Sequence, residues 1–489
     1  MKYNETKLIV FLQTFSEDEV AEFEKFISSP YFKKGRDLVP LLKAILKFYP
    51  DLSQKGLDEE SIYKEIYPDA RFGDRKSKDI LKTLSSSLLK MAEEFMMLAN
   101  LNRSRPLKDR LLLDELLDRG LIKYYSQYRQ KADAELNSPG ESSVQALLDN
   151  YFLQSTDTRC HIMSLDHALY REHVFKSGDY LSAHYIVNLL RILKLRQIAE
   201  AYQQVPFEES IPDKVFGRLD LEEIVEFYRG SEFEVFVSFH YYTYMSIKNN
   251  CDEGYFHKAK KIFLANRSRL SNYEKMYFYS DLLNILNIGY MPGKDAENRK
   301  EIFHLQILCI EDKAYKLDRE KYMHPDFFRN IIINALYVKE FEEAIGFVDK
   351  YISELEPKFR ANMKHYSKAL IAFAKSEFED ALVNISKVKY DLIDFKIDVK
   401  ILSMKIFYEL RMTEQAYSIV DTFRHYLRSG KDLTPELRAN YVNFIVYYLK
   451  LFHACFSKNK DEALIAKKEA MQEPLLAQKP WLLAKFSEL

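Results

Sequence analysis

One helical pattern recurs three times between residues 325 and 430, at spacings of 37 and 35 residues, and it restricts the fold more than any other feature. The stretch SEFEDALVNI, residues 376–385, shows it best, because an aromatic residue follows a short turn and an alanine stands three positions later. The unit before this stretch keeps both residues, and the unit after it has lost the aromatic one. In chain order, the three pairs are Phe341 and Ala344, Phe378 and Ala381, and Thr413 and Ala416.

This pattern is typical of two antiparallel helices joined by a short turn. After Ala381, apolar residues return at Ile385 and Val388, the spacing of one face of a helix. Two helices approach closely only where their contact carries a small side chain, and alanine supplies it. Helix breakers are also scarce, with 13 Gly and 14 Pro in 489 residues. We find no convincing strand pattern and therefore predict an all-α fold.

At these residues the chain resembles the tetratricopeptide repeat (TPR) family, in which helix hairpins of about 34 residues stack into an α-solenoid. The elements Gly178–Ala183 and Gly254–Ala259 suggest further repeat turns. The family's small residue in the first helix is kept as Ala369 but becomes Ile332 and Met404 in the neighbouring units. The resemblance implies a divergent, TPR-like α-solenoid, and the alternative is a non-repetitive helical bundle.

Three regions follow from this reading: a helical N-terminal domain over 1–100, TPR-like repeats over 101–473, and a capping helix over 474–489. The first region should contain four or five helices. A capping box at Ser16 and Glu19 begins one of them, and Asp74 begins a long one. The end of a solenoid needs a cap, and we place the single tryptophan, Trp481, in that cap.

Most of the chain also resembles a group of uncharacterised helical bacterial proteins, through three short stretches that bring no known activity. These stretches are Ser29–Phe32, Tyr67–Pro68 and Phe423–Arg428.

Composition narrows the function. The 72 basic and 73 acidic residues give a net charge of −1, so the chain as a whole has no attraction to nucleic acid or acidic membranes. Four widely separated cysteines share no metal-binding spacing and are typical of reduced cytosolic thiols. Neither a signal peptide nor a membrane span is expected, so we predict a cytoplasmic protein.

The sequence offers only weak evidence for a metal-binding or catalytic site. His161, His167 and His173 crowd one expected helix, but a spacing of six residues leaves neighbours about 120° apart, so we expect no metal site. None of the common nucleotide-binding, hydrolase or metalloprotease motifs is present in the sequence. We therefore predict a non-enzymatic protein without a cofactor, and the reading leaves open a catalytic site assembled from distant residues.

The TPR resemblance implies that a protein or peptide binds on the concave face formed by the first helix of each pair. Tyrosine and arginine are frequent binding anchors, although each of these positions could instead serve packing between repeats, as we favour for Phe373. The outward positions transferred from the family are Arg329, Tyr337, Tyr366, Phe373, Lys405 and Tyr408.

The alternative is a DNA-binding regulator whose N-terminal domain resembles a helix-turn-helix. Arg75, Lys78 and Lys82 share one face of the expected long helix, and residues 71–90 hold six basic and two acidic residues. Such a face suits phosphate contacts. Two observations oppose this reading: the helix continues where a winged helix would place a β-hairpin, and residues 1–100 are near neutral, with 16 basic and 17 acidic residues.

Overall fold

The structure is a computed structural model that describes residues 3–32, 35–54, 56–138, 140, 142–203, 208–288, 295–317, 320–389, 393–429, 433–457 and 459–489. Every regular element within these ranges is helical, and the one β-bridge found there pairs Ser142 with Leu270. The predicted all-α class is therefore confirmed for the described part of the chain. No helix in that part is both long enough and apolar enough to cross a lipid bilayer.

The helices divide between two compact units: Met1–Ser138 with Gln145–Ser182, and Pro139–Val144 with Ala183–Leu489. Helix α9 contributes residues to both units. In chain order the helices are η1 (Tyr3–Glu5), α1 (Lys7–Gln13), α2 (Glu17–Ser28), α3 (Val39–Leu46), α4 (Glu59–Ile66), α5 (Arg75–Arg103), α6 (Arg105–Asp118), α7 (Ile122–Leu136), α8 (Val144–Met163), α9 (His167–Gln203), α10 (Ile211–Phe216), α11 (Leu221–Phe227), α12 (Glu234–Lys248), α13 (Glu253–Asn266), α14 (Asn272–Ile288), α15 (Asp295–Glu311), α16 (Pro325–Tyr337), α17 (Phe341–Tyr351), η2 (Ile352–Glu354), α18 (Pro357–Ala374), α19 (Phe378–Ile385), α20 (Ile393–Glu409), α21 (Thr413–Ser429), α22 (Pro435–Ser457), α23 (Lys460–Gln472) and α24 (Lys479–Ser487).

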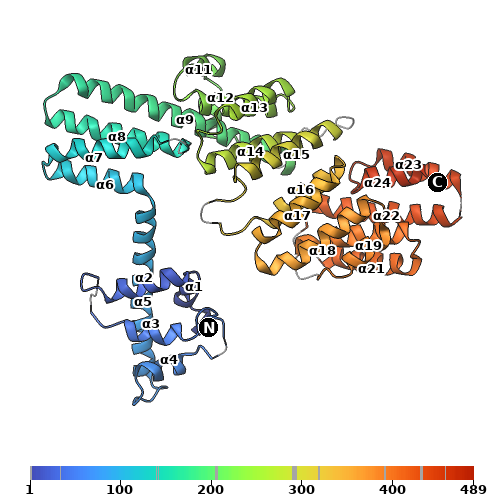
Figure 1. The fold of residues 1–489 in the computed structure, drawn as a ribbon, viewed down its shortest axis with the longest axis horizontal. Coiled ribbons are helices and arrows are strands. Elements are labelled where there is room, and N and C mark those ends of the chain that lie inside the picture. Colours follow the sequence, from blue (N-terminus) through green and yellow to red (C-terminus); the bar gives the residue numbers. More distant parts are fainter. Residues whose placement is uncertain are drawn as a thin grey trace. The chain divides into compact units, whose positions relative to one another are not determined.

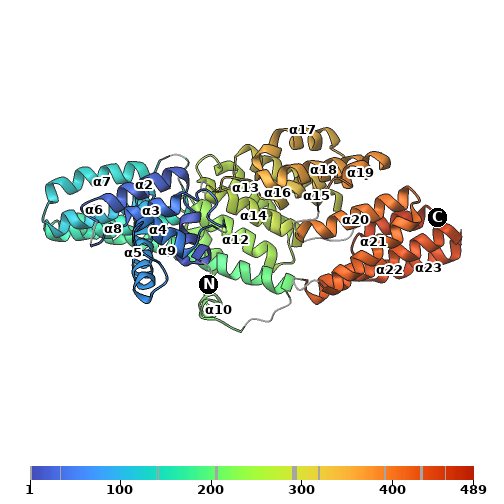
Figure 2. The ribbon, with the colours of Figure 1, turned by 90° about the horizontal axis from the view of Figure 1, so that it is seen from below.

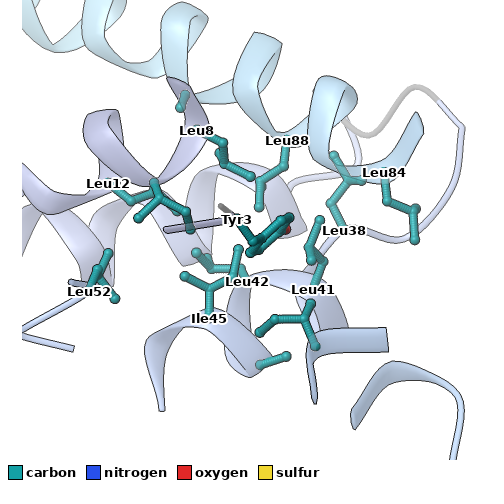
Figure 3. Close-up of a cluster of buried hydrophobic side chains, with 14 of the residues drawn as sticks. Tyr3, Leu8, Leu12, Leu38, Leu41, Leu42, Ile45, Leu52, Leu84 and Leu88 are labelled. Atoms are coloured by element: carbon teal, nitrogen blue, oxygen red, sulfur yellow. The ribbon is translucent and has the colours of Figure 1, made fainter. Parts of the chain in front are cut away.

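Helices α1 to α5, together with Tyr3 of η1, surround one apolar core, to which α5 contributes a full face (Figure 3). The predicted capping box is present, because Ser16 Oγ accepts from the Glu19 amide and the Glu19 carboxylate accepts from the Ser16 amide. Asp74 caps α5 by accepting from the amide of Ser77 at 2.8 Å. Caps of this kind supply a partner to backbone amides that have none within the helix. The boundary predicted after residue 100 falls inside α5, which ends at Arg103.

The three predicted repeat units are helix pairs in the structure: α16 with α17, α18 with α19, and α20 with α21. Helices α16 to α19 lie side by side, as do α20 to α23, in both views (Figures 1 and 2). The alanine at the expected close contact of each pair is buried. These residues are Ala344, Ala381 and Ala416.

The turns of these three pairs share one backbone geometry. The residue two positions before each second helix is left-handed, with φ of 66° at Lys339, 64° at Ser376 and 59° at Arg411. The next amide in each turn donates to the carbonyl five residues earlier, at 2.9 Å every time. This combination is the Schellman ending of a helix. The sequence repeat is thus also a repeat of turn conformation.

One predicted repeat turn is wrong. Gly178–Ala183 lies inside α9, which runs without a break from His167 to Gln203. The other element, Gly254–Ala259, does lie in the first two turns of a second helix, α13. Its left-handed residues, Asn250 and Cys251, come before the glycine and not at it.

Candidate functional site

Only one of the six predicted partner-binding residues is well exposed. Tyr337, on α16, has 46% of its surface exposed, and the Arg299 guanidinium lies 5.3 Å from the centre of its ring. Arg329, on the same helix, is engaged within the protein: its Nη1 lies 2.7 Å from Asp398 Oδ2 on α20 and 3.4 Å from Asp326 Oδ1. This ion pair ties the first helices of two pairs together.

Two of the predicted outward positions are wrong. Tyr366 and Tyr408 are each only 3% exposed, because both belong to apolar cores. Helix α20 supplies residues to two cores, one shared with α16–α19 and the other with α21–α24, so it has no open first-helix face to present. Phe373 is half-buried, with its ring centre 5.5 Å from that of Phe378, which fits the packing role we favoured for it.

The C-terminal helix α24 covers the predicted face at α20. The Lys405 ammonium is hydrogen-bonded to Gln478 and lies 5.4 Å from the centre of the Trp481 ring. Burial of this ammonium lowers the pKa of Lys405 to about 8. Trp481 also meets Tyr408 edge to face, with ring centres 5.6 Å apart. The place expected for a partner is therefore occupied by residues 478–481 of the same chain.

Helix α24 is held by apolar and charged contacts together. Leu482 and Phe486 are buried in the core built by α20–α24. Lys485 Nζ lies 2.9 Å from Glu409 Oε1 at the end of α20. Asn443, on α22, donates to the carbonyl of Leu475 at 2.9 Å. The predicted capping segment thus packs over α20 and α22, and Trp481 lies within it.

The basic face predicted on α5 is exposed along its whole length. Arg75, Lys78 and Lys82 are exposed, and the Arg75 side chain is 96% exposed, with only a loose 3.8 Å contact to Asp79. Ser86 is exposed as well, whereas Ser85 is hydrogen-bonded to the Tyr3 hydroxyl at 2.9 Å. Helix α5 continues to Arg103, as expected, so the position of a wing is helical.

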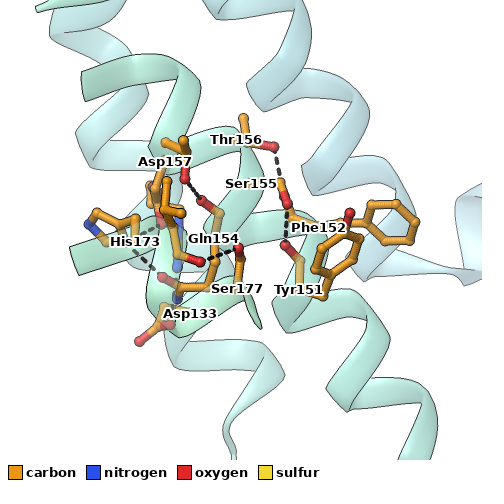
Figure 4. A network of polar contacts seen from close by, with 12 residues as sticks. Asp133, Tyr151, Phe152, Gln154, Ser155, Thr156, Asp157, His173 and Ser177 are labelled. Atoms are coloured by element: carbon orange, nitrogen blue, oxygen red, sulfur yellow. Dashed lines mark hydrogen bonds and ion pairs between the residues drawn. The ribbon is translucent and has the colours of Figure 1, made fainter. Parts of the chain in front are cut away.

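The histidines belong to two helices and not to one, which corrects the sequence-based prediction. A turn at Leu165 separates α8 from α9 and brings the rings of His161 and His173 into parallel contact, 5.0 Å apart. His173 Nδ1 lies 2.7 Å from Gln154 Oε1 and 3.6 Å from Asp157 Oδ2 (Figure 4). Burial is the main cause of a lowered His173 pKa.

Asp157 is the centre of this polar network between helices. Its carboxylate accepts from the Tyr125 hydroxyl at 2.7 Å and from Arg129 Nε at 2.9 Å, both on α7. Its charge is thus neutralised locally by Arg129. No group of three or more His, Cys, Asp or Glu side chains in the described ranges could hold a metal ion.

A buried charge cluster that was not predicted from the sequence lies in the second unit, where it joins α9, α12 and α14. We define the buried charge cluster as Arg191, Lys194, His240, Glu274 and Asp281. Lys194 has no exposed surface and forms an ion pair with Asp281. Arg191 Nη2 lies 2.7 Å from Glu274 Oε2, and the guanidinium also stacks over the Tyr277 ring at 4.2 Å. The positive charges of Arg191 and Lys194 thus balance the negative charges of Glu274 and Asp281.

The hydrogen bonds within this cluster fix the state of His240. Arg191 Nε, which cannot lose its proton, donates to His240 Nε2 at 3.2 Å. Because Nε2 accepts this bond, the ring is neutral, and its Nδ1 lies 3.4 Å from Lys194 Nζ and 3.8 Å from Asp281 Oδ2. Burial first, and then the Lys194 and Arg191 charges, hold the His240 pKa well below its usual value.

The buried charge cluster holds helices together, and its buried groups cannot reach a substrate. A nucleophile or base must reach its substrate, and the side chains of Lys194 and His240 have no exposed area. Burial lowers the pKa of Lys194 and raises that of Asp281. Glu274 additionally accepts from the Val144 amide at 2.8 Å, at the first residue of α8. The sequence did contain a signal for this cluster, because the charged residues Arg191 and Lys194 interrupt the apolar run of α9.

Comparisons with known proteins add no assignment. No protein family, no curated protein and no solved structure matches this chain.

Proposed function

We propose that this protein is a non-enzymatic, TPR-like α-solenoid that binds a protein or peptide partner through first helices of its repeats. The observation that carries the proposal is the common turn at Lys339, Ser376 and Arg411, each followed five residues later by a buried alanine. A repeated helix pair buries its apolar face only by stacking on its neighbours. Such stacks present extended surfaces that suit partner binding.

The corrected binding face lies on α16 and α18, since α24 covers α20. Tyr337 is its exposed aromatic residue, and Lys364 and Lys368 are exposed one helical turn apart on α18. Tyrosine is enriched among residues that dominate binding energy. The two lysines would favour an acidic segment of the partner. Arg329 would support this face by fixing α16 against α20.

The test is affinity purification with cross-linking from the native cell, comparing two triple variants. Tyr337→Ala with Lys364→Glu and Lys368→Glu should remove the main cross-linked partner. The matched control, Tyr417→Ala with Lys350→Glu and Lys387→Glu, changes an equally exposed tyrosine and two lysines away from first helices, and should retain it. Equal recovery of the partner by both variants would rule out this face.

The second candidate function is that of a DNA-binding regulator, and exposure of the α5 basic face is the observation that favours it. Arg75, Lys78 and Lys82 lie in the first two turns of α5, free to approach a phosphate backbone. Each phosphate contact by such a cation adds to the salt dependence of binding. The Asp79 carboxylate on the same helix and the helical course after residue 96 weigh against it.

This candidate is tested by a mobility-shift titration with duplex DNA over a range of salt concentrations. Binding at low salt that disappears in Arg75→Ala/Lys78→Ala/Lys82→Ala would support it. The control, Lys108→Ala/Lys123→Ala/Lys131→Ala, removes the same charge from exposed positions of α6 and α7. Absence of binding at low salt, or equal losses in both variants, would exclude a specific role for α5.

A further inference from the structure

The sequence of α9 contains a turn signal that its conformation does not use. In the three repeat turns, the left-handed residue stands two positions before the next helix and five positions before the buried alanine. Gly178 has the same spacing to Tyr180 and to Ala183, and Ala183 is buried in the same way. In the structure, nevertheless, Gly178 lies within a helix of 37 residues.

The residues at this position favour a turn more strongly than those of the three real turns. The left-handed conformation is strained for Lys339, Ser376 and Arg411, but glycine adopts it without cost. Asp179 would then be the N-cap of the following helix, a position for which aspartate is among the best residues. Inside a continuous helix, both residues are unfavourable compared with alanine.

Packing gives no reason for the glycine. A Cβ atom added at Gly178 would meet no atom within 4 Å, so no close approach of another helix requires its absence. Replacing Gly178 by alanine is therefore sterically free in the continuous helix. The glycine therefore has no packing role in the continuous helix.

The two halves of α9 differ sharply in how they are held. From His167 to Asp179 no residue is fully buried and His173 is only partly so, whereas Tyr180, Ala183 and Val187 are buried. The division between the two compact units falls at Ser182 and Ala183, within one helical turn of Asp179. Helical segments with little buried apolar surface open at low cost in free energy. The signal thus lies where the helix changes from loosely to firmly packed.

We propose that Gly178 and Asp179 form a hinge, at which α9 interconverts between a continuous helix and a helical hairpin with the turn geometry of Lys339, Ser376 and Arg411. In the hairpin, Gly178 takes the left-handed conformation and Asp179 caps a new helix that starts at Tyr180. This conformational change is separate from the proposed partner binding and does not depend on it.

The test is a distance measurement by electron spin resonance across the hinge in the full chain. Spin labels are attached at Ala168→Cys and Ile192→Cys, both exposed, after Cys251 and Cys455 are replaced by serine. A continuous helix separates these positions by about 36 Å, whereas a hairpin brings them within about 20 Å. The wild-type chain should show both populations.

Gly178→Ala should decrease the ratio of the short to the long population by at least about fivefold, since it favours the helix and penalises the turn. The matched control is Gly346→Ala in α17, another helical glycine whose Cβ would meet nothing within 4 Å. It should leave the distances unchanged. A single distance near 36 Å in the wild-type chain, or an equal response to both substitutions, would overturn the hinge.

Leu181→Pro tests the opposite direction. Proline is tolerated in the first turn of a helix but breaks a helix interior, so it should enrich the short distance. Leu181 is partly exposed, which limits the loss of packing. If Leu181→Pro retains the long distance in a folded chain, the hairpin does not form; if it does not fold, Gly178→Ala and its control still decide.

Discussion

At the scale of single residues, Lys194 and Asp281 show how a buried ion pair restrains the fold. Both charges have left water, and each is compensated by the other within the buried charge cluster. Burial penalises each charge, as the lowered pKa of Lys194 and the raised pKa of Asp281 indicate. We infer that this pair contributes more to selecting one helix arrangement than to net stability.

Removing one member of the ion pair should therefore reduce the free energy of unfolding more than removing both members does. Lys194→Met leaves the Asp281 carboxylate buried without its cation and should reduce the free energy of unfolding by about 3–5 kcal/mol. Lys194→Met with Asp281→Leu should recover most of that loss, since no charge is then stranded. Urea unfolding of the three proteins measures this. A double variant as unstable as the single one would show that packing around the lysine stem dominates.

His240 should make stability depend on pH. Its pKa lies well below the unfolded value of about 6.5, so the unfolded chain takes up a proton first as the pH falls. The stabilisation is fully present above about pH 6.5 and is lost as the pH falls towards the folded pKa, by at most about 1.4 kcal/mol per pH unit.

The measurement is the thermal midpoint between pH 7.5 and 5 for the wild-type chain and for His240→Gln, which keeps an acceptor for Arg191. The wild-type midpoint should fall more steeply below pH 6.5. Parallel curves would mean that His240 titrates normally in the folded protein. His173, whose pKa is also lowered, contributes equally to both proteins and so cancels.

At the scale of helices and turns, the left-handed residues are strained, and replacing them by glycine should stabilise the chain. Ser376 and Lys339 are exposed and hold φ near 65°, which glycine adopts freely. Ser376→Gly and Lys339→Gly should each stabilise the chain, by up to about 1 kcal/mol.

Lys375→Gly supplies the contrast, because Lys375 has a φ of −81° and gains nothing from glycine. It should be destabilising. Urea midpoints distinguish the three variants, and a loss of stability in Ser376→Gly would contradict the assigned turn conformation.

Local signals predicted the helix ends well where a single residue decides them. Asp74 and Ser16 cap the helices they were expected to cap, because a side-chain oxygen beside free amides acts within a few residues. The turn predicted at Gly178 is absent for a different reason. The same local preference exists there, but a continuous helix forms across it, and sequence alone does not weigh the two states against each other.

At the scale of the whole molecule, the candidate site was predicted only in part. The positions on α16 followed from the repeat, and Tyr337 is exposed as expected. The predicted exposure of Tyr366 and Tyr408 is wrong because burial depends on which segments pack over a helix. Tyr366, on α18, lies in the core of α16–α19, and Tyr408 lies on α20, which has neighbours on two faces. The buried charge cluster brings together residues between 191 and 281. Helical periodicity predicts which residues share a face of one helix, and it does not predict contacts between residues so far apart in the sequence.

The covering helix α24 leads to a prediction for the molecule as a whole. Leu482 has no exposed surface, whereas Leu464, on α23, is 51% exposed. Leu482→Ser should loosen α24 and lower solubility, as should deletion of residues 474–489, while Leu464→Ser should have little effect. Light scattering after chromatography compares the variants. Unchanged solubility and melting of the truncated chain would show that α24 is not needed to cover the core.

In the solenoid proposed above, the helix pairs would form, in the language of polymers, a one-dimensional lattice whose exposed end accepts another unit. Leu482 and Phe486 of α24 fill an apolar site of the core shared with α20–α23 from within the same molecule. A chain without α24 would leave that site open. Copies of it should then add to one another in sequence, and the size of the product should rise with protein concentration.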